Sequence, residues 1–412
     1  MTAPPARPGS VFLLVTLVLV NTINWADRQV VPILVPSIKA ELSLSDTEIG
    51  ILGGVAFSLV YAVAAFVFGF LADRSSRRAV ILFGLVCWSI ATAASGLAHD
   101  FWTLFAARFA TGLGEASLYP CAMSLLADAW PPERRGRAIG ILGASTALGG
   151  GLGIGLGGWL VTRIGWRDVF LWYGASGLVV LPLLLMLKEP ARAPGHGDGG
   201  HESPFVIVVE ALKDVRLLAV WTTGALLIAS ATAWITWAPS YFQRDLGFEV
   251  GEIGVVFGIA QLVGGVFGSV AGGLLGDRWR KRRMAGQLNV AALAALVGVP
   301  LVGTALSGAS HELLLVAAVL GPFAIFATFP PLQTIVAEIV PARRLGLAFA
   351  VHVLFLSGIG AALGPFLVGR ISDATGSLRT ALLVPVLGCL VSAAGAWAAG
   401  AIVRARTPQS PA

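Results

Sequence analysis

Long apolar blocks recur along the chain, and they constrain its fold more than any other feature. Each block has roughly 20 residues, the length a helix needs to cross ~30 Å of hydrocarbon at 1.5 Å per residue. Only 12% of the 412 residues are charged, whereas a soluble globular chain carries about 25%. So little charge cannot cover the surface of a water-soluble protein of this size. We therefore predict an all-α membrane protein.

The apolar blocks predict twelve spanning helices. They lie at residues 11–35, 48–72, 78–98, 101–128, 136–161, 167–187, 217–242, 251–276, 284–306, 312–338, 345–369 and 379–403. The first block runs through Asn21, Asn24 and Asp27 without a small-residue cleavage site, so we interpret it as a spanning helix and not as a signal peptide. The three cysteines have no metal-ligand spacing, so we expect no disulfide framework and no metal site.

The loops between the predicted helices differ in positive charge. Of the 28 Lys and Arg residues, 20 lie on the side of the two termini and 6 on the opposite side, while Arg28 and Arg108 lie inside helices. Cytoplasmic loops of membrane proteins are enriched in Lys and Arg. We therefore predict a multi-pass protein of the inner membrane with both termini in the cytoplasm, and we attribute the net charge of +6 to topology and not to nucleic-acid binding.

The longest polar stretch separates the sixth and seventh predicted helices. It contains EPARAPGHGDGGHESP, whose Gly and Pro content is typical of a flexible linker. The segment FVIVVEALKDVR after it has apolar residues on one helical face, which favours a short helix on the membrane surface, with a plain loop as the alternative. We therefore divide the chain into a six-helix bundle over 1–187, a cytoplasmic linker over 188–216 and a second six-helix bundle over 217–412.

The two predicted bundles repeat each other in sequence. Residues 69–78 read GFLADRSSRR and residues 273–282 read GLLGDRWRKR, so both fit G-x-x-x-D-R-x-x-[RK]-R at an offset of 204 residues. PERRGRA at 132–138 and PARRLGL at 341–347 repeat at an offset of 209 residues. Parallel repeats of this kind are an architecture of secondary transporters.

With these loops after the second and eighth helices, the chain resembles the major facilitator superfamily over essentially its whole length. Ser76 departs from the family pattern, which usually has glycine there. Within the superfamily, NTINWADRQVV at 21–31, RFATGLGEASLYP at 108–120 and ADAWPPERRGRAIGI at 127–141 are similar to the spinster family of lipid transporters. The nearest rival is the anion:cation symporter family, which also carries N-x-x-D-R in its first helix and an acidic residue in its fourth.

The resemblance implies a major facilitator fold of two pseudo-symmetric six-helix bundles that works by alternating access. It further implies proton-coupled export of a lysophospholipid-like or sphingolipid-like amphiphile, or of an amphiphilic drug. Within transport, the alternative is proton-coupled symport of a small organic anion such as a sugar acid. From another class, a non-transporting membrane sensor stays open. We expect a monomer whose partners are the lipid bilayer, its substrate and protons.

Four ionisable residues lie inside the first and fourth predicted helices: Asp27, Arg28, Arg108 and Glu115. A charge near the bilayer centre costs at least ~2.5–3.5 kcal/mol, so such residues tend to pair, to face a cavity and to have a function. Arg108 and Glu115 are about two helical turns apart and share one face. We predict that Asp27 and Glu115 carry protons and that Arg108 pairs with each in turn, while Arg28 holds the anionic part of the substrate. The alternative is a static ion-pair cluster that fixes helix packing.

Three more residues complete the predicted substrate site: Asn24, Tyr119 and His352. They join the two arginines and Glu115 named above. His352 is a candidate proton relay because the usual pKa of histidine is about 6.5, although a lone histidine in a helix more often makes an interhelical hydrogen bond. The second half otherwise offers mainly apolar and aromatic residues such as Trp234. This asymmetry suits an amphiphile, with its headgroup toward the first half and its chain toward the second.

The charged loops predict a cytoplasmic gate between the halves. The resemblance assigns this role to eight residues: Asp73, Arg74, Arg77, Glu133, Arg134, Arg137, Asp277 and Arg278. In this prediction Asp73 accepts hydrogen bonds from a helix N-terminus across the interface, where the helix dipole favours an anion. The arginines pair with Glu133 nearby. Breaking these contacts opens the cytoplasmic side.

Missing motifs argue against two other classes of protein. No G-x-x-x-x-G-K-[ST] sequence is present, so we expect no nucleotide binding and no cofactor. The glycines of GGGLGIGLGG in the fifth helix instead indicate close helix packing in lipid. The sequence shows no nucleophile with a nearby base and no cluster of metal ligands, so we do not expect an enzyme.

Overall fold

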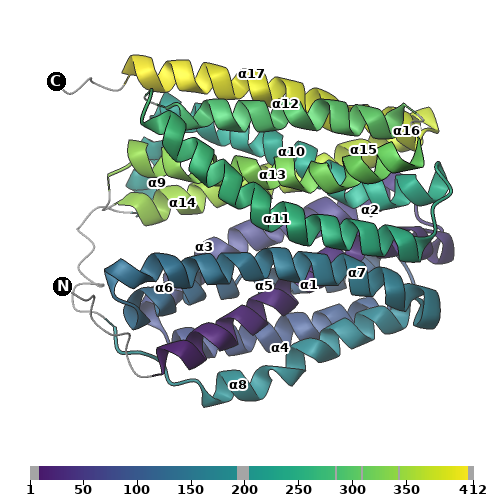
Figure 1. Ribbon diagram of the computed structural model, residues 1–412. Coiled ribbons are helices and arrows are strands. Elements are labelled where there is room, and N and C mark those ends of the chain that lie inside the picture. Colours follow the sequence, from purple (N-terminus) through teal and green to yellow (C-terminus); the bar gives the residue numbers. More distant parts are fainter. Residues whose placement is uncertain (1–8, 193–203, 284, 308–309, 342–343, 407–412) are drawn as a thin grey trace.

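The structure is a computed structural model of the chain, and it describes residues 9–192, 204–283, 285–307, 310–341 and 344–406. Every regular element in these residues is a helix. Figure 1 shows two groups of long helices that run side by side, one from α1 to α8 and the other from α10 to α17. We call them the first half and the second half. The predicted all-α fold is confirmed.

The first half follows the predicted order of spans. Its elements are α1 (Ser10–Leu42), α2 (Asp46–Gly50), the π-helix η1 (Ile51–Leu59), α3 (Val60–Arg74), α4 (Arg77–Ser95), α5 (Phe101–Glu115), α6 (Leu118–Ala129), α7 (Pro132–Val179) and α8 (Leu181–Met186). The short helix α9 (Pro204–Lys213) comes next. Between the two predicted alternatives for this segment, the structure therefore favours the helix.

The second half has a matching succession of helices. Its elements are α10 (Val215–Arg244), α11 (Val250–Arg280), α12 (Gln287–Leu306), α13 (His311–Ile339), α14 (Leu345–Val353), the π-helix η3 (Leu354–Ala361), α15 (Ala362–Thr375), α16 (Leu378–Ala381) and α17 (Leu383–Arg406). The helices α14, η3 and α15 follow one another without a break and together form one span.

Ten helices in the described part of the chain are long and apolar enough to cross a membrane. One of them, Arg134–Met186, has 53 residues, which is the length of two spans. Gly165 divides it, because its φ of 78° is a conformation that glycine adopts without strain. Another predicted span is divided into α5 and α6 at Ala116 and Ser117. These two divisions reconcile the ten helices with the twelve predicted spans.

The first helix is longer than predicted. α1 continues past residue 35 to Leu42, with Pro32 and Pro36 inside it. Proline usually ends a helix because it lacks an N–H group, but neighbouring helices in a membrane bundle can satisfy the carbonyl groups that it frees. The extension carries Lys39 to the end of the bundle, where it meets Asp46.

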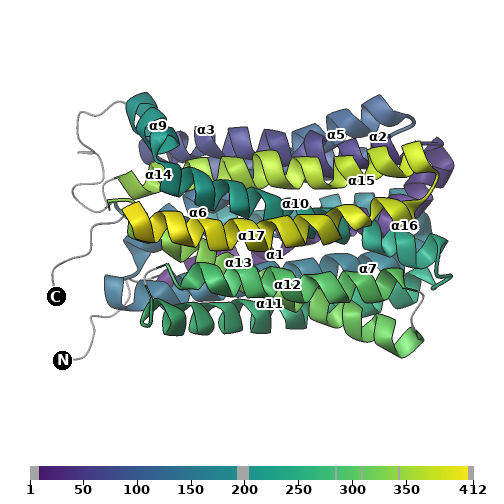
Figure 2. The same ribbon diagram turned by 90° about the horizontal axis from the view of Figure 1, so that it is seen from above.

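The two ends of the bundle are distinct. α1 begins and α17 ends at the same end, on the left in Figures 1 and 2, which we call the terminal end. α2 and α16 lie at the opposite end, which we call the distal end. Helix α7 packs along α1, and Gly153 permits this close approach, since a Cβ atom there would lie 2.5 Å from the Ala26 carbonyl oxygen. The glycines of the fifth predicted helix thus position the part of α1 that carries Asp27.

Candidate functional site

The four charged residues predicted inside the membrane meet in the first half. Asp27 and Arg28 come from α1, and Arg108 and Glu115 come from α5. Asp27 and Glu115 are 0% exposed and Arg108 is 3% exposed. Both acids therefore point into the protein and not toward lipid, and we call these four residues the charge cluster.

The ion pair within the charge cluster differs from the predicted one. Nε of Arg28 lies 2.5 Å from Oε2 of Glu115. The sequence predicts that Arg108 pairs with Asp27 and Glu115 in turn, and in this structure Nε and Nη1 of Arg108 have no hydrogen-bond partner among the described residues. In this structure Arg28 of α1 is therefore the partner of Glu115. The pairing of Arg108 with each acid in turn stays a prediction.

Several buried polar atoms of the site have no partner in the described part of the chain. Oδ2 of Asp27 accepts a hydrogen bond of 3.3 Å from Oγ1 of Thr92, but Oδ1 is unbonded, as are Oε1 of Glu115 and Nδ2 of Asn24. An unsatisfied buried polar atom costs about 1–3 kcal/mol. Native proteins retain such atoms mainly where a proton, a water molecule or a ligand binds.

Three aromatic rings surround Arg28. Its guanidinium carbon lies 4.2 Å from the ring centre of Tyr61, 5.0 Å from that of Trp25 and 5.1 Å from that of Phe57. We call these rings the aromatic cage. The sequence analysis missed all three residues. The spacing of Trp25, one helical turn before Arg28, could have indicated the first of them.

Phe57 is shared by both arginines of the charge cluster, since the guanidinium carbon of Arg108 also lies 5.1 Å from its ring centre. The ring is carried by η1, and π-helices occur frequently at functional sites. Gly112 of α5 lets η1 come close, because a Cβ atom there would lie 2.8 Å from the Phe57 carbonyl oxygen. A larger residue at this position would push the ring away from both guanidinium groups.

The other predicted substrate contacts are spread over both halves. Tyr119 of α6 is 51% exposed. His352 lies in the second half on α14, is buried, and has its ring 6.0 Å from that of Phe349. No described contact joins His352 to the charge cluster, so its part in substrate binding stays a prediction.

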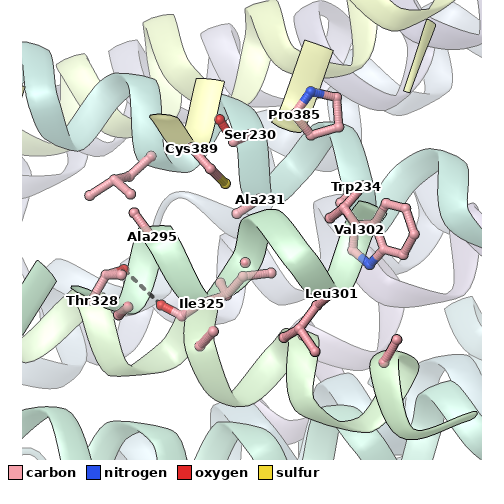
Figure 3. A pocket seen from close by; sticks show the side chains of 16 residues that line it. Ser230, Ala231, Trp234, Ala295, Leu301, Val302, Ile325, Thr328, Pro385 and Cys389 are labelled. Carbon is pink, nitrogen blue, oxygen red and sulfur yellow. Dashed lines mark hydrogen bonds between the residues drawn. The ribbon is translucent and has the colours of Figure 1, made fainter. Parts of the chain in front are cut away.

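The second half contains an apolar cavity between α10, α12, α13 and α17 (Figure 3). Ser230 and Thr328 are its polar members, and Oγ1 of Thr328 donates to the Ile325 carbonyl oxygen at 2.7 Å. Trp234 lines the cavity, whereas Trp237 bonds to the Pro365 carbonyl oxygen. The two halves thus differ in kind, with charges buried in the first and an apolar cavity in the second.

At the distal end, a second polar cluster joins the two halves. The buried carboxylate of Asp46 in α2 forms an ion pair with Lys39 of the same half. It also accepts hydrogen bonds from two residues of the second half, at 3.1 Å from Nη1 of Arg244 and at 2.6 Å from Oγ of Ser372. One carboxylate therefore holds both halves, and the sequence analysis did not single it out.

A second acid completes this junction from the other side. Asp373 of α15 accepts hydrogen bonds from the backbone N–H groups of Asp46 at 3.0 Å and Thr47 at 2.7 Å. These are the first two residues of α2, and the N-terminus of a helix favours an anion. We call Lys39, Asp46, Arg244, Ser372 and Asp373 the distal latch.

The predicted gate residues lie at the terminal end. The side chains of Asp73 and Glu133 are outside the described part of the structure. Arg77 is buried and pairs with Asp128, and its Nε lies 2.8 Å from Oε1 of Glu189. These partners belong to the first half and the adjoining segment, so the described bonds of Arg77 do not link the halves.

The remaining gate residues are Arg74, Arg134, Arg137, Asp277 and Arg278. Arg74 stacks on Phe70 of its own helix, with its guanidinium carbon 3.6 Å from the ring centre. The side chains of Arg137, Asp277 and Arg278 are exposed, and Arg134 is half-buried. The gate role of all these residues stays a prediction.

Comparisons with known proteins agree with the fold. Residues 17–365 match the family model of the Major Facilitator Superfamily. The chain is 29% identical over 387 residues to an MFS-type efflux pump of Mycolicibacterium smegmatis (92% of this chain, 88% of that protein). It is 27% identical over 391 residues to Protein spinster of Drosophila melanogaster (90% and 64%), and 29% identical over 403 residues to the probable L-galactonate transporter of Escherichia coli (93% and 86%).

A solved structure shows the same arrangement of helices. It is a bacterial homologue of the human lysosomal transporter spinster in an inward-facing and unoccupied conformation, with a TM-score of 0.87, 24% sequence identity and coverage of 99% of this chain and 100% of that one. The family model covers most of the chain, and its members are transporters and not enzymes. The chain therefore belongs to the Major Facilitator Superfamily, as a secondary membrane transporter that resembles the spinster proteins.

Proposed function

We propose that this transporter exports an amphiphile in exchange for protons by alternating access, with Asp27 and Glu115 as the proton carriers. The observation that carries the proposal is the complete burial of both carboxylates beside two arginines, with one oxygen of each unbonded within the described structure. A purely structural ion pair would not need unbonded oxygens in the low-dielectric interior, where they are costly.

Arg28 is the residue to which we assign the switch. It bonds Glu115 in this structure and is the most exposed member of the charge cluster, with a side chain that is 15% exposed. Removing a guanidinium group from a buried carboxylate favours protonation of that carboxylate, and returning it favours proton release. Movement of Arg28 would therefore couple a substrate headgroup to a proton. Arg108, which is buried and shares the Phe57 ring with Arg28, would keep the site electrostatically balanced.

The amphiphilic nature of the substrate follows from the difference between the halves. A headgroup would meet the charge cluster, and an apolar chain would lie against the second half, whose cavity is lined mainly by Ala, Leu, Val, Ile and Trp234. The similarity to an efflux pump and to Protein spinster supports export of this class of substrate.

We further propose that the terminal end faces the cytoplasm of a cell with an inner membrane, as the distribution of Lys and Arg predicts. With the distal latch formed, the protein would then be in an inward-facing state. The bundles over 1–187 and 217–412, joined by the linker 188–216, would rock as units within a monomer.

Proteoliposomes test the proposal. Purified protein is reconstituted, a pH gradient is imposed, and uptake of a radiolabelled lysophospholipid is compared with uptake of L-galactonate. We expect gradient-driven lysophospholipid transport that is abolished by Asp27→Asn and by Glu115→Gln, while Asp168→Asn, which changes an exposed acid outside the cluster, has no effect. Gradient dependence that survives in both cluster variants would rule out these proton carriers.

The symport of a small organic anion is the second candidate. The two unbonded nitrogens of Arg108 could bind a carboxylate, and the relative from Escherichia coli is a probable L-galactonate transporter. Accumulation of L-galactonate with no lysophospholipid transport in the same proteoliposomes would select this function over the first.

A further inference from the structure

We propose that the aromatic cage is a binding site for an organic ammonium group, which Arg28 fills when no substrate is bound. This inference rests on the proposed function and names the headgroup class of its amphiphile. Three rings within 4.2–5.1 Å of one cationic carbon form a cage, and aromatic cages are a common means of binding quaternary ammonium groups.

The cage has its own carboxylate. Glu115 lies at its base, 2.5 Å from Arg28, and is fully buried with Oε1 unbonded in the described structure. A quaternary ammonium group has no N–H to donate, so it needs ring faces and a nearby negative charge and not a directional acceptor. Rings from Trp25, Phe57 and Tyr61 around this acid meet both requirements.

Charge balance favours exchange of one cation for another. The charge cluster holds two acids and two arginines, so its formal charge is zero when all four are ionised. An ammonium group that displaces Arg28 keeps that balance, whereas an anion added beside Glu115 would leave an excess of negative charge in a poorly solvated site. The cage therefore selects cationic or zwitterionic headgroups. With a zwitterion, the displaced Arg28 could pair with the phosphate.

Arg28 is also the member of the cluster that can move. Its side chain is 15% exposed, whereas Arg108 is buried and lies over one ring of the cage. Trp25 and Tyr61 are each partly exposed as well. A headgroup would therefore reach the cage from the side of Arg28.

Direct binding tests this site without a pH gradient. Radiolabelled dodecyltrimethylammonium is bound to the protein in lipid nanodiscs and displaced with the unlabelled compound. We expect Arg28→Gln to tighten binding about tenfold because the internal competitor is gone, and Tyr61→Leu to weaken it about tenfold because one ring is lost. Tyr61→Phe keeps the ring and should stay within about twofold of the wild type. Trp172→Leu, at an exposed site on α7, is the control for removal of an aromatic ring.

The Arg28 variant separates a binding site from a merely structural cage. If the rings only stabilise Arg28, its removal will leave binding unchanged or weaker, and this outcome overturns the proposal. Because Arg28→Gln leaves Glu115 without its partner, the melting temperature of each variant is also measured with and without the probe. We expect the probe to stabilise Arg28→Gln more than the wild type. Equal binding of dodecyl sulfate would show recognition of the chain alone and would also overturn the proposal.

The two proposals can fail separately. If transport in proteoliposomes does not depend on the pH gradient, but ammonium binding still depends on the cage residues, only the transport mechanism is contradicted. Gradient-driven transport with no effect of Tyr61→Leu or Arg28→Gln on ammonium binding would contradict the cage only.

Discussion

The two ends of the interface between the halves use buried charge differently. At the distal end, Asp46 of the first half is shared with Arg244 and Ser372 of the second. At the terminal end, Arg77 is buried just as deeply, but its described bonds go to Asp128 and Glu189 on its own side. A carboxylate shared between halves must be released when they separate, whereas an ion pair within one half can persist through the whole cycle.

The largest expected effect concerns stability at the terminal end. Arg77→Ala leaves buried Asp128 without its arginine partner, and breaking a buried pair costs about 3–5 kcal/mol. We expect a marked fall in the melting temperature in detergent with no change in the opening of either end. Arg278→Ala, at an exposed site, serves as the control. If Arg77→Ala instead opened the terminal end while stability held, Arg77 would be the inter-half contact that its sequence motif predicts.

The second effect concerns opening at the distal end. Asp46→Asn removes the charge that holds Lys39 and Arg244, and each hydrogen bond to a charged group contributes about 1.5–3 kcal/mol. A net change of about 3 kcal/mol alters the ratio of open to closed molecules roughly a hundredfold. Spin labels at Leu97 and Glu249, in a background without the three cysteines, should report longer distances across the distal end. An unchanged distance distribution would contradict the latch.

A smaller effect is expected on the other acid of the distal latch. Asp373→Ala removes the acceptor of two backbone N–H groups at the N-terminus of α2, which costs about 1 kcal/mol. The same spin labels should show an increase in the open population of about fivefold. Asp373→Asn retains a side-chain oxygen that can accept these bonds and should differ less from the wild type. Equal effects of the two substitutions would mean that the capping bonds contribute nothing.

The smallest effect depends on pH. Burial by itself would raise the pKa of Glu189, but the hydrogen bonds from Arg77 and Ser76 outweigh it and hold the pKa below its usual range. A group with a lowered pKa in the folded state stabilises that state above its unfolded pKa of about 4.3, and the stabilisation is lost as the pH falls through the folded pKa. The difference in melting temperature between wild type and Glu189→Gln should therefore shrink below about pH 4.3. A difference that stays constant would contradict this linkage.

Much of the fold could be predicted from local sequence. Apolar length and loop charge place the helices, and the repeated G-x-x-x-D-R motif predicts two similar halves. The difference between the predicted and observed helix ends is also local. The first helix was predicted to end at residue 35, because the sequence does not show that neighbouring helices stabilise α1 as far as Leu42.

The candidate site was predicted in its charges but not in its contacts. Intramembrane Asp27 and Glu115 stand out because a charge in lipid is costly wherever the chain places it. In this structure Glu115 pairs with Arg28, which reaches it from another helix, whereas the sequence analysis considered only Arg108 of its own helix as its partner. The rings of Phe57 and Tyr61 were missed because an aromatic residue in an apolar helix is ordinary until its neighbours are known.

The amino-acid sequence alone determined that this chain crosses a membrane in helices, that its halves are related, and where in the chain its costly charges lie. These properties depend on the composition and periodicity of single segments. The tertiary structure decided which charges meet. Arg28 and Glu115 are 87 residues apart, Asp46 and Arg244 are 198 apart, and Asp46 and Asp373 are 327 apart. Such partners depend on how helices pack and which way each side chain points, and no single segment records either.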